Sequence, residues 1–203
     1  MSDIAGILLA GGLSRRMGGG DKCLRVLGGE TILARIIRRV RPQVGALVLN
    51  ANGDGARFAD YGLPVRADVV EGYAGPLAGV LTGMAWAKEA APDCRWLASF
   101  ACDAPFLPGD LVARLRAEAE AVGADLACAA SGGRRHPVFG LWPLRLHDEL
   151  RRAILDEGIR KVEDWTARYK VAMADFPATP VDPFFNTNRP DDLAEAERLL
   201  LAQ

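Results

Sequence analysis

A glycine-rich, cationic loop near the start of the chain carries residue types that bind phosphate. The apolar run 4–10 ends at Gly11 and Gly12, and two cations, Arg16 and Lys22, follow. Backbone N–H groups of such a turn after a strand can close on phosphate oxygens. The spacing lacks both the Lys-Ser/Thr pair of a P-loop and the GxGxxG pattern of a dinucleotide fold. The loop therefore predicts a different triphosphate site, with the Gly11 and Gly12 amides against the phosphates and Arg16 and Lys22 as fixed cations.

A carboxylate follows another apolar run further along the chain. Asp103 comes directly after the predicted buried strand 96–102 and before Ala104 and Pro105. A solvated charge is a poor explanation for this position, whereas Mg²⁺ usually takes one or two carboxylates together with substrate phosphates. We therefore predict Mg²⁺ as the cofactor and Asp103 as its ligand.

The composition is that of an ordinary globular protein. The 203 residues carry a formal net charge of -1, and half of them are hydrophobic. No overall field favours nucleic acid or an anionic membrane, and no apolar run approaches the roughly 18 residues of a membrane span. Cys102 and Cys128 lie in apolar runs without CxxC spacing, which predicts buried free thiols and a reducing, cytoplasmic compartment.

Short apolar runs alternate with helical patterns along most of the chain. This alternation predicts an α/β fold with helices on both faces of a mostly parallel sheet. Ligands bind beyond the strand carboxyl ends in such sheets, where Gly11, Asn50, Asp68 and Asp103 would meet. The predicted strands are 4–9, 46–51, 63–66, 96–102, 124–130, 137–142 and 171–176, and the predicted helices begin near residues 31, 76, 110, 144, 161 and 190.

Several polar side chains have more than one interpretation at this stage. The arginines of the first helix, Arg35, Arg38 and Arg39, are predicted to form a solvated face. Gly75 and Gly79, at the start of the second helix, predict a close approach of the helix start to either the ligand or the sheet. The loop 132–136 could bind an acceptor phosphate or be an exposed turn.

The residues quoted so far resemble a known family. The stretch LAGGLSRRMGGGDK at 9–22 is similar to the LAGGxSxRMGxxK signature of the MobA family of nucleotidyltransferases, the molybdenum cofactor guanylyltransferases. AGPLAG at 74–79 and the Asp103-Ala104-Pro105 block resemble later motifs of that family. The resemblance implies a single three-layer, Rossmann-like domain over 1–203, of the nucleotide-diphospho-sugar transferase type. Its nucleotide-binding half would span about 1–107 and its acceptor-binding half about 108–203.

The resemblance also implies an activity and its residues. The reaction would be Mg²⁺-dependent transfer of GMP from GTP to the terminal phosphate of the molybdopterin cofactor, with release of pyrophosphate. Molybdoenzyme-maturation proteins would be the partners. The catalytic residues would be Arg16, Lys22 and Asp103; the nucleotide-binding residues Leu9, Ala10, Gly11, Gly12, Lys22, Asn50, Asp68 and Asp103; the acceptor-site candidates Arg134, Arg135, His136, Asn186 and Asn188.

Three alternatives remain open from the sequence. A cytidylyltransferase acting on the same cofactor would differ in the base contacted by Asn50 and Asp68. A sugar-phosphate nucleotidyltransferase would differ in the acceptor. A nucleotide-binding regulator without turnover is a third alternative, against which the combination of Gly11, Lys22 and Asp103 argues.

Overall fold

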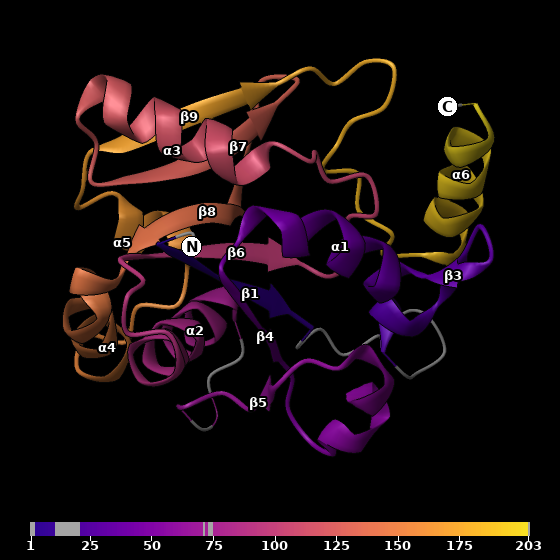
Figure 1. Ribbon diagram of the computed structural model, residues 1–203. Coiled ribbons are helices and arrows are strands. Elements are labelled where there is room, and N and C mark those ends of the chain that lie inside the picture. The colour runs from indigo at the N-terminus through magenta and orange to yellow at the C-terminus, as the bar shows by residue number, and fades with distance from the viewer. Residues whose placement is uncertain (1–2, 11–20, 71, 73–74, 203) are drawn as a thin grey trace.

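A computed structural model describes residues 3–10, 21–70, 72 and 75–202, and it contains one seven-stranded sheet at its centre (Figure 1). The strand order is β5-β4-β1-β6-β8-β7-β9. Among the described strands only β8 runs against the others: β6 and β7 pair with it antiparallel, and the remaining neighbours are parallel. The predicted mostly parallel α/β sheet is confirmed.

The elements follow the predicted order with small shifts at their ends. The six α-helices of the described residues are α1 (Ile32–Val40), α2 (Pro76–Ala90), α3 (Leu111–Val122), α4 (His147–Leu155), α5 (Val162–Thr166) and α6 (Pro190–Leu201). The sheet strands are β1 (Ile4–Leu9), β4 (Ala46–Asn50), β5 (Val65–Arg66), β6 (Trp96–Ala101), β7 (Leu126–Ser131), β8 (Arg134–Pro143) and β9 (Val171–Phe176).

Helices cover both faces of the sheet, which gives the predicted three layers. On one face α1 and α3 pack over alternate strand residues such as Leu8 and Phe100. On the other face α2, α4 and α5 pack over the intervening residues, among them Ile7 and Leu97. This alternation follows from the two-residue period of a strand, which sends successive side chains to opposite faces.

Several short elements were not predicted from the sequence. A two-stranded hairpin, β2 (Val26–Leu27) with β3 (Glu30–Thr31), lies between the first loop and α1, and a 3-10 helix covers Gly55–Tyr61. The basic loop predicted at 132–136 is instead a tight turn, because Gly132 and Gly133 have positive φ and β8 already begins at Arg134. The two consecutive central residues of such a turn both need the left-handed conformation that glycine adopts without strain.

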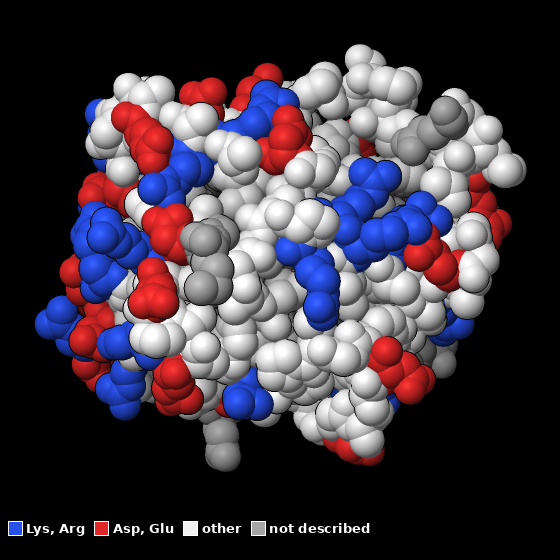
Figure 2. Space-filling view, in the orientation of Figure 1, with Lys and Arg blue, Asp and Glu red and all other residues white. Residues whose placement is uncertain are grey.

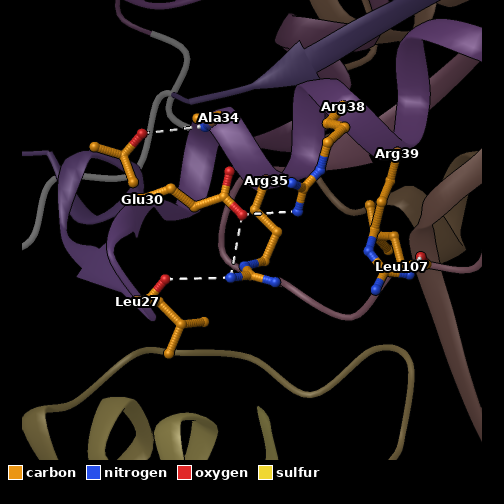
Figure 3. Close-up of polar contacts among 8 residues, drawn as sticks. Leu27, Glu30, Ala34, Arg35, Arg38, Arg39 and Leu107 are labelled. Atoms are coloured by element: carbon orange, nitrogen blue, oxygen red, sulfur yellow. Dashed lines mark hydrogen bonds and ion pairs between the residues drawn. The ribbon is translucent and has the colours of Figure 1, made fainter. Parts of the chain in front are cut away.

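Arg35 corrects the prediction of a solvated arginine face on α1. Its side chain is buried beneath the hairpin, where it donates to the Leu27 carbonyl at 3.3 Å and pairs with Glu30 at 3.1 Å (Figure 3). Arg38 shares the same Glu30 carboxylate, and Arg39 donates to the Leu107 carbonyl. Basic side chains gather on the surface where α1 lies (Figure 2). The arginines therefore fix α1 to its neighbours.

The prediction that Cys102 and Cys128 are buried free thiols is confirmed. Both side chains are buried and unpaired, and burial raises the pKa of Cys128 to about 12, so that its thiol stays protonated at neutral pH.

In the described part of the chain, no helix has the length and apolar character needed to cross a membrane.

Candidate functional site

Four strands end side by side at the edge where the sequence places the site. Leu9 at the end of β1 is in register with Asn50 of β4 and with Ala101 of β6, and Asn50 is in register with Arg66 of β5. The side chains that follow these ends therefore share one edge of the sheet, as predicted. Gly11, Gly12 and Arg16 lie outside the described residues.

Asp103 and Lys22 form the charged centre of this edge. Burial raises the pKa of the Asp103 carboxyl, and the positive charge of Lys22 partly offsets that effect. Asp103 Oδ1 is buried and accepts no hydrogen bond from any described residue. Lys22 Nζ donates to Asn188 Oδ1 at 2.7 Å. A buried carboxylate oxygen without a partner, beside an oriented ammonium group, is suited to a cation and a polyphosphate.

The segment 182–188 joins this centre to the β7–β8 turn. At one end Asn188 holds Lys22, and next to it Thr187 donates its N–H and its hydroxyl to the Asp103 carbonyl at 2.8 and 3.0 Å. At the other end Asp182 accepts a hydrogen bond from Ser131 at 2.8 Å. One segment thus fixes the backbone of Asp103 and the side chain of Lys22. The family resemblance gives Asn186 and Asn188 as acceptor-site candidates and assigns no role to Thr187.

His136 lies in the same neighbourhood with a defined hydrogen-bond role. Its ring stacks on Phe184 at 4.6 Å between centroids, and its Nε2 lies 2.8 Å from Ser131 Oγ. Because the single Ser131 proton goes to Asp182, Nε2 must be the donor, so Nδ1 of the neutral ring is an acceptor. Burial lowers the pKa of His136, which favours this neutral form. The stacking on Phe184 and the hydrogen bond to Ser131 therefore hold the ring in place, and its Nδ1 can accept a hydrogen bond.

The remaining acceptor-site candidates have fewer contacts. Arg134 and Arg135 start β8 and are exposed, and Asn186 is exposed beside the buried Thr187. The structure thus brings His136 and Asn188 into one hydrogen-bonded arrangement with the segment 182–188. It leaves the two arginines and Asn186 at the surface near that arrangement.

Asn50 and Asp68 form the other end of the site, together with Asn52. Asn50 Nδ2 donates to Asp68 Oδ1 at 2.9 Å, and Asn52 Nδ2 donates to Asp68 Oδ2 at 2.8 Å. The Asn52 side-chain oxygen in turn accepts the Asp68 backbone N–H at 2.9 Å. Each carboxylate oxygen keeps a second lone pair for a ligand. Asn50 and Asp68 are therefore brought together as predicted, whereas no role was assigned to Asn52.

Gly79 on α2 lies against this amide–carboxylate group and against β1. A Cβ at Gly79 would fall 2.5 Å from Leu9 Cδ2 and 2.6 Å from Asn50 Oδ1. The close approach of the helix start to the sheet, one of the two alternatives from the sequence, is therefore present, and it includes the Asn50 side chain. Ala10, the next residue after Leu9, is buried and donates its N–H to the Asn50 carbonyl at 2.9 Å.

The family resemblance implies GTP binding, and we expect Gly79→Ala to weaken it about ten-fold, because the added methyl group must displace Leu9 or the Asn50 amide. Gly83→Ala is the matched control, since its Cβ would fall 2.8 Å from Ile7 and Leu97 in the core and does not approach Asn50. The measurement is the Kd of GTP for each folded variant by calorimetry. Equal affinity losses in the two variants would contradict a local effect on Asn50.

Comparison with known proteins identifies the family. The MobA-like NTP transferase domain matches residues 6–171 of the chain. Among solved structures, the molybdopterin-guanine dinucleotide biosynthesis protein A of Archaeoglobus fulgidus superposes with a TM-score of 0.77 at 24% identity, covering 98% of this chain and 100% of that one. At this identity the superposition shows the shared fold.

Two bacterial relatives share much more of the sequence. The molybdenum cofactor guanylyltransferase of Bradyrhizobium sp. (strain ORS 278) is 60% identical over 97% of this chain and 92% of its own length. The protein of the same name from Rhodopseudomonas palustris (strain HaA2) is 58% identical with the same coverage. With these matches, the chain belongs to the MobA-like NTP transferase family and is a nucleotidyltransferase.

Proposed function

We propose that the protein transfers GMP from GTP to the terminal phosphate of the molybdopterin cofactor and releases pyrophosphate. The observation that carries this proposal is the Asp103–Lys22 centre at the carboxyl edge of the sheet, with an unpartnered carboxylate oxygen beside an ammonium group that Asn188 orients. The names of relatives up to 60% identical support the choice of nucleotide and acceptor.

In this reaction an oxygen of the acceptor phosphate attacks the α-phosphorus of GTP in line, and the bond to the leaving pyrophosphate breaks. The attacking oxygen is already an anion, so the step requires no strong general base. Catalysis then depends on positioning and on neutralising charge. Lys22 would bind phosphate oxygens, and Asn188 would hold its ammonium group in place. Arg16 and the Gly11 and Gly12 amides would complete the phosphate site.

Asp103 is the residue that would hold Mg²⁺. Its Oδ1 is buried without a hydrogen-bond partner among the described residues, which fits a cation ligand. When bound, Mg²⁺ supplies charge neutralisation on the phosphates and orients them. The described ranges contain no group of three or more His, Cys, Asp or Glu arranged for a metal. This arrangement is compatible with Mg²⁺, which relies on few carboxylates and on substrate phosphates.

The base would lie at Asp68, with Leu9 and Ala10 lining the nucleotide. Guanine presents adjacent N–H donors on one edge, and a carboxylate can accept both. Asp68 is oriented by two amides, Asn50 and Asn52, that occupy one lone pair of each oxygen. Cytosine has one amino donor beside the acceptors N3 and O2, so a carboxylate that would accept two hydrogen bonds from guanine would accept from the amino group of cytosine alone, which supports GTP over CTP.

The test is a transfer assay with molybdopterin cofactor as acceptor and either GTP or CTP as donor. We expect pyrophosphate release and a guanine dinucleotide product, detected by mass, with GTP and Mg²⁺. Chelation of the metal with EDTA should stop the reaction. Transfer from CTP at an equal or higher rate would refute the guanylyl assignment.

A further inference from the structure

Arg57 connects the two ends of the site, although neither the sequence motifs nor the proposed reaction uses it. The residue lies in the 3-10 helix Gly55–Tyr61, which follows β4. Its Nε pairs with Asp21 Oδ2 at 2.5 Å, and Asp21 directly precedes Lys22. Its Nη2 donates to the Asn52 carbonyl at 2.8 Å, and its Nη1 donates to the Asp54 carbonyl.

These three contacts use three different nitrogens, Nε, Nη1 and Nη2, of one planar guanidinium group. The fork of N–H donors is rigid, so its position fixes the carboxylate and the two carbonyls relative to one another. The Arg57 side chain is 30% exposed and that of Asp21 is 19% exposed, so solvent screens the ion pair only in part. A pair of this kind adds little to global stability. Its main effect is to hold in place the turn that carries Asn52.

Asn52 transmits that effect to the predicted base site. Arg57 holds the backbone of Asn52, and the Asn52 side chain holds Asp68 by a reciprocal pair of hydrogen bonds, Nδ2 to Oδ2 and Asp68 N–H to Oδ1. A turn without Arg57 would lose the hydrogen bonds to the Asn52 and Asp54 carbonyls. Asn52 would then orient the Asp68 carboxylate less strictly.

We propose that Arg57 is a positioning residue for nucleotide selection. Acting through Asn52, it keeps the Asp68 carboxylate directed at the base edge, and through Asp21 it ties the same turn to the segment that carries Lys22. The inference rests on the proposed function, because it assumes that Asp68 accepts hydrogen bonds from a purine edge. Arg57 itself touches neither the base nor the reacting atoms.

The experiment compares GTP with inosine triphosphate, which keeps the N1–H of guanine and lacks its 2-amino group. For the full-length protein, kcat/KM and Kd are measured for both nucleotides. We expect Arg57→Ala to lower the GTP preference roughly three- to ten-fold, the value of a weakened hydrogen bond. Arg66→Ala is the matched control, because this exposed neighbour also carries one positive charge and its guanidinium donates to the carbonyl of the adjacent Val65.

Two further variants separate positioning from simple destabilisation. Arg57→Lys keeps the charge near Asp21 and cannot reproduce the fork, so its nucleotide preference should resemble that of Arg57→Ala. In an Asn52→Ala background, Arg57→Ala should lower the preference no further, because its route to Asp68 is already removed. An unchanged preference in Arg57→Ala, or full recovery in Arg57→Lys, would overturn the inference.

Failure of the proposed function gives a different result. If the wild-type protein did not discriminate between GTP and inosine triphosphate, the assignment of Asp68 to a guanine base would be wrong. If the wild-type protein discriminates and Arg57→Ala does so equally, the base assignment stands and only the role of Arg57 is wrong.

Discussion

Replacement of Asp103 by Asn should lower kcat for nucleotidyl transfer about a thousand-fold, the scale expected when a preorganised charge is lost from a reaction centre. The amide keeps the shape of the side chain and removes its negative charge, including that on Oδ1, which accepts no hydrogen bond from the described residues. The measurement is pyrophosphate release at saturating GTP and Mg²⁺. Asp103→Ala should also lose turnover.

The fold should survive this substitution. Burial raises the pKa of Asp103, so the ionised carboxylate costs folding free energy in the absence of a cation. Thr187 contacts the backbone carbonyl of Asp103, and the Asn variant retains that contact. Thermal unfolding in metal-free buffer should therefore show equal or higher stability for Asp103→Asn.

Asp110→Asn serves as the matched control for charge. Asp110 is exposed before α3, and its side chain makes no capping hydrogen bond. Its variant should transfer GMP at the wild-type rate. Near-normal Mg²⁺-dependent activity in Asp103→Asn would refute the assignment of Asp103.

Replacement of Lys22 by Gln should lower kcat/KM for GTP about a hundred-fold, because the neutral side chain no longer offsets phosphate charge. Asn188→Ala should have a smaller effect, since it leaves the ammonium group and removes only the oxygen that orients it at 2.7 Å. Steady-state kinetics with varied GTP measure both effects. Lys88→Gln, an exposed position on α2, is the control for loss of a positive charge.

The double variant tests whether Lys22 and Asn188 act as a unit. If Asn188 acts by positioning Lys22, its removal should have little effect once Lys22 is Gln, and the two free-energy losses should not add. Fully additive losses would show that Asn188 acts independently of Lys22, for instance by a direct contact with the acceptor.

The sequence predicted the parts of the fold that depend on short-range patterns. Apolar runs located the strands, and the edge shared by Asn50, Asp68 and Asp103 followed from the parallel topology. Pro190 at the start of α6 was also predicted, although no capping hydroxyl precedes it. The Asp192 carboxylate supplies the missing cap by accepting the N–H groups of Asn188 and Arg189.

The features that sequence reasoning missed depend on contacts between distant segments. Helical periodicity placed Arg35 on the polar face of α1, but the β2–β3 hairpin covers that face and supplies Glu30 and the Leu27 carbonyl. Arg57 lies 36 residues from Asp21 and carries no local pattern that relates the two. Such contacts follow from the fold and not from local sequence patterns. For the contacts of Arg57, the only feature visible in the sequence is Asn52, the second asparagine of Asn50-Ala51-Asn52.

The contact between Lys22 and Asn188 spans 166 residues and has a consequence for biosynthesis. On the ribosome the sheet strands near Lys22 emerge long before Asn188 and Thr187 do. The N-terminal segment can therefore begin to fold early. Lys22 lacks its hydrogen bond to Asn188, and the Asp103 carbonyl lacks its hydrogen bonds from Thr187, until the segment 182–188 has emerged. A nascent or prematurely terminated chain that lacks this segment should bind nucleotide weakly and leave GTP unconsumed, so that catalytic competence is reached only late in translation.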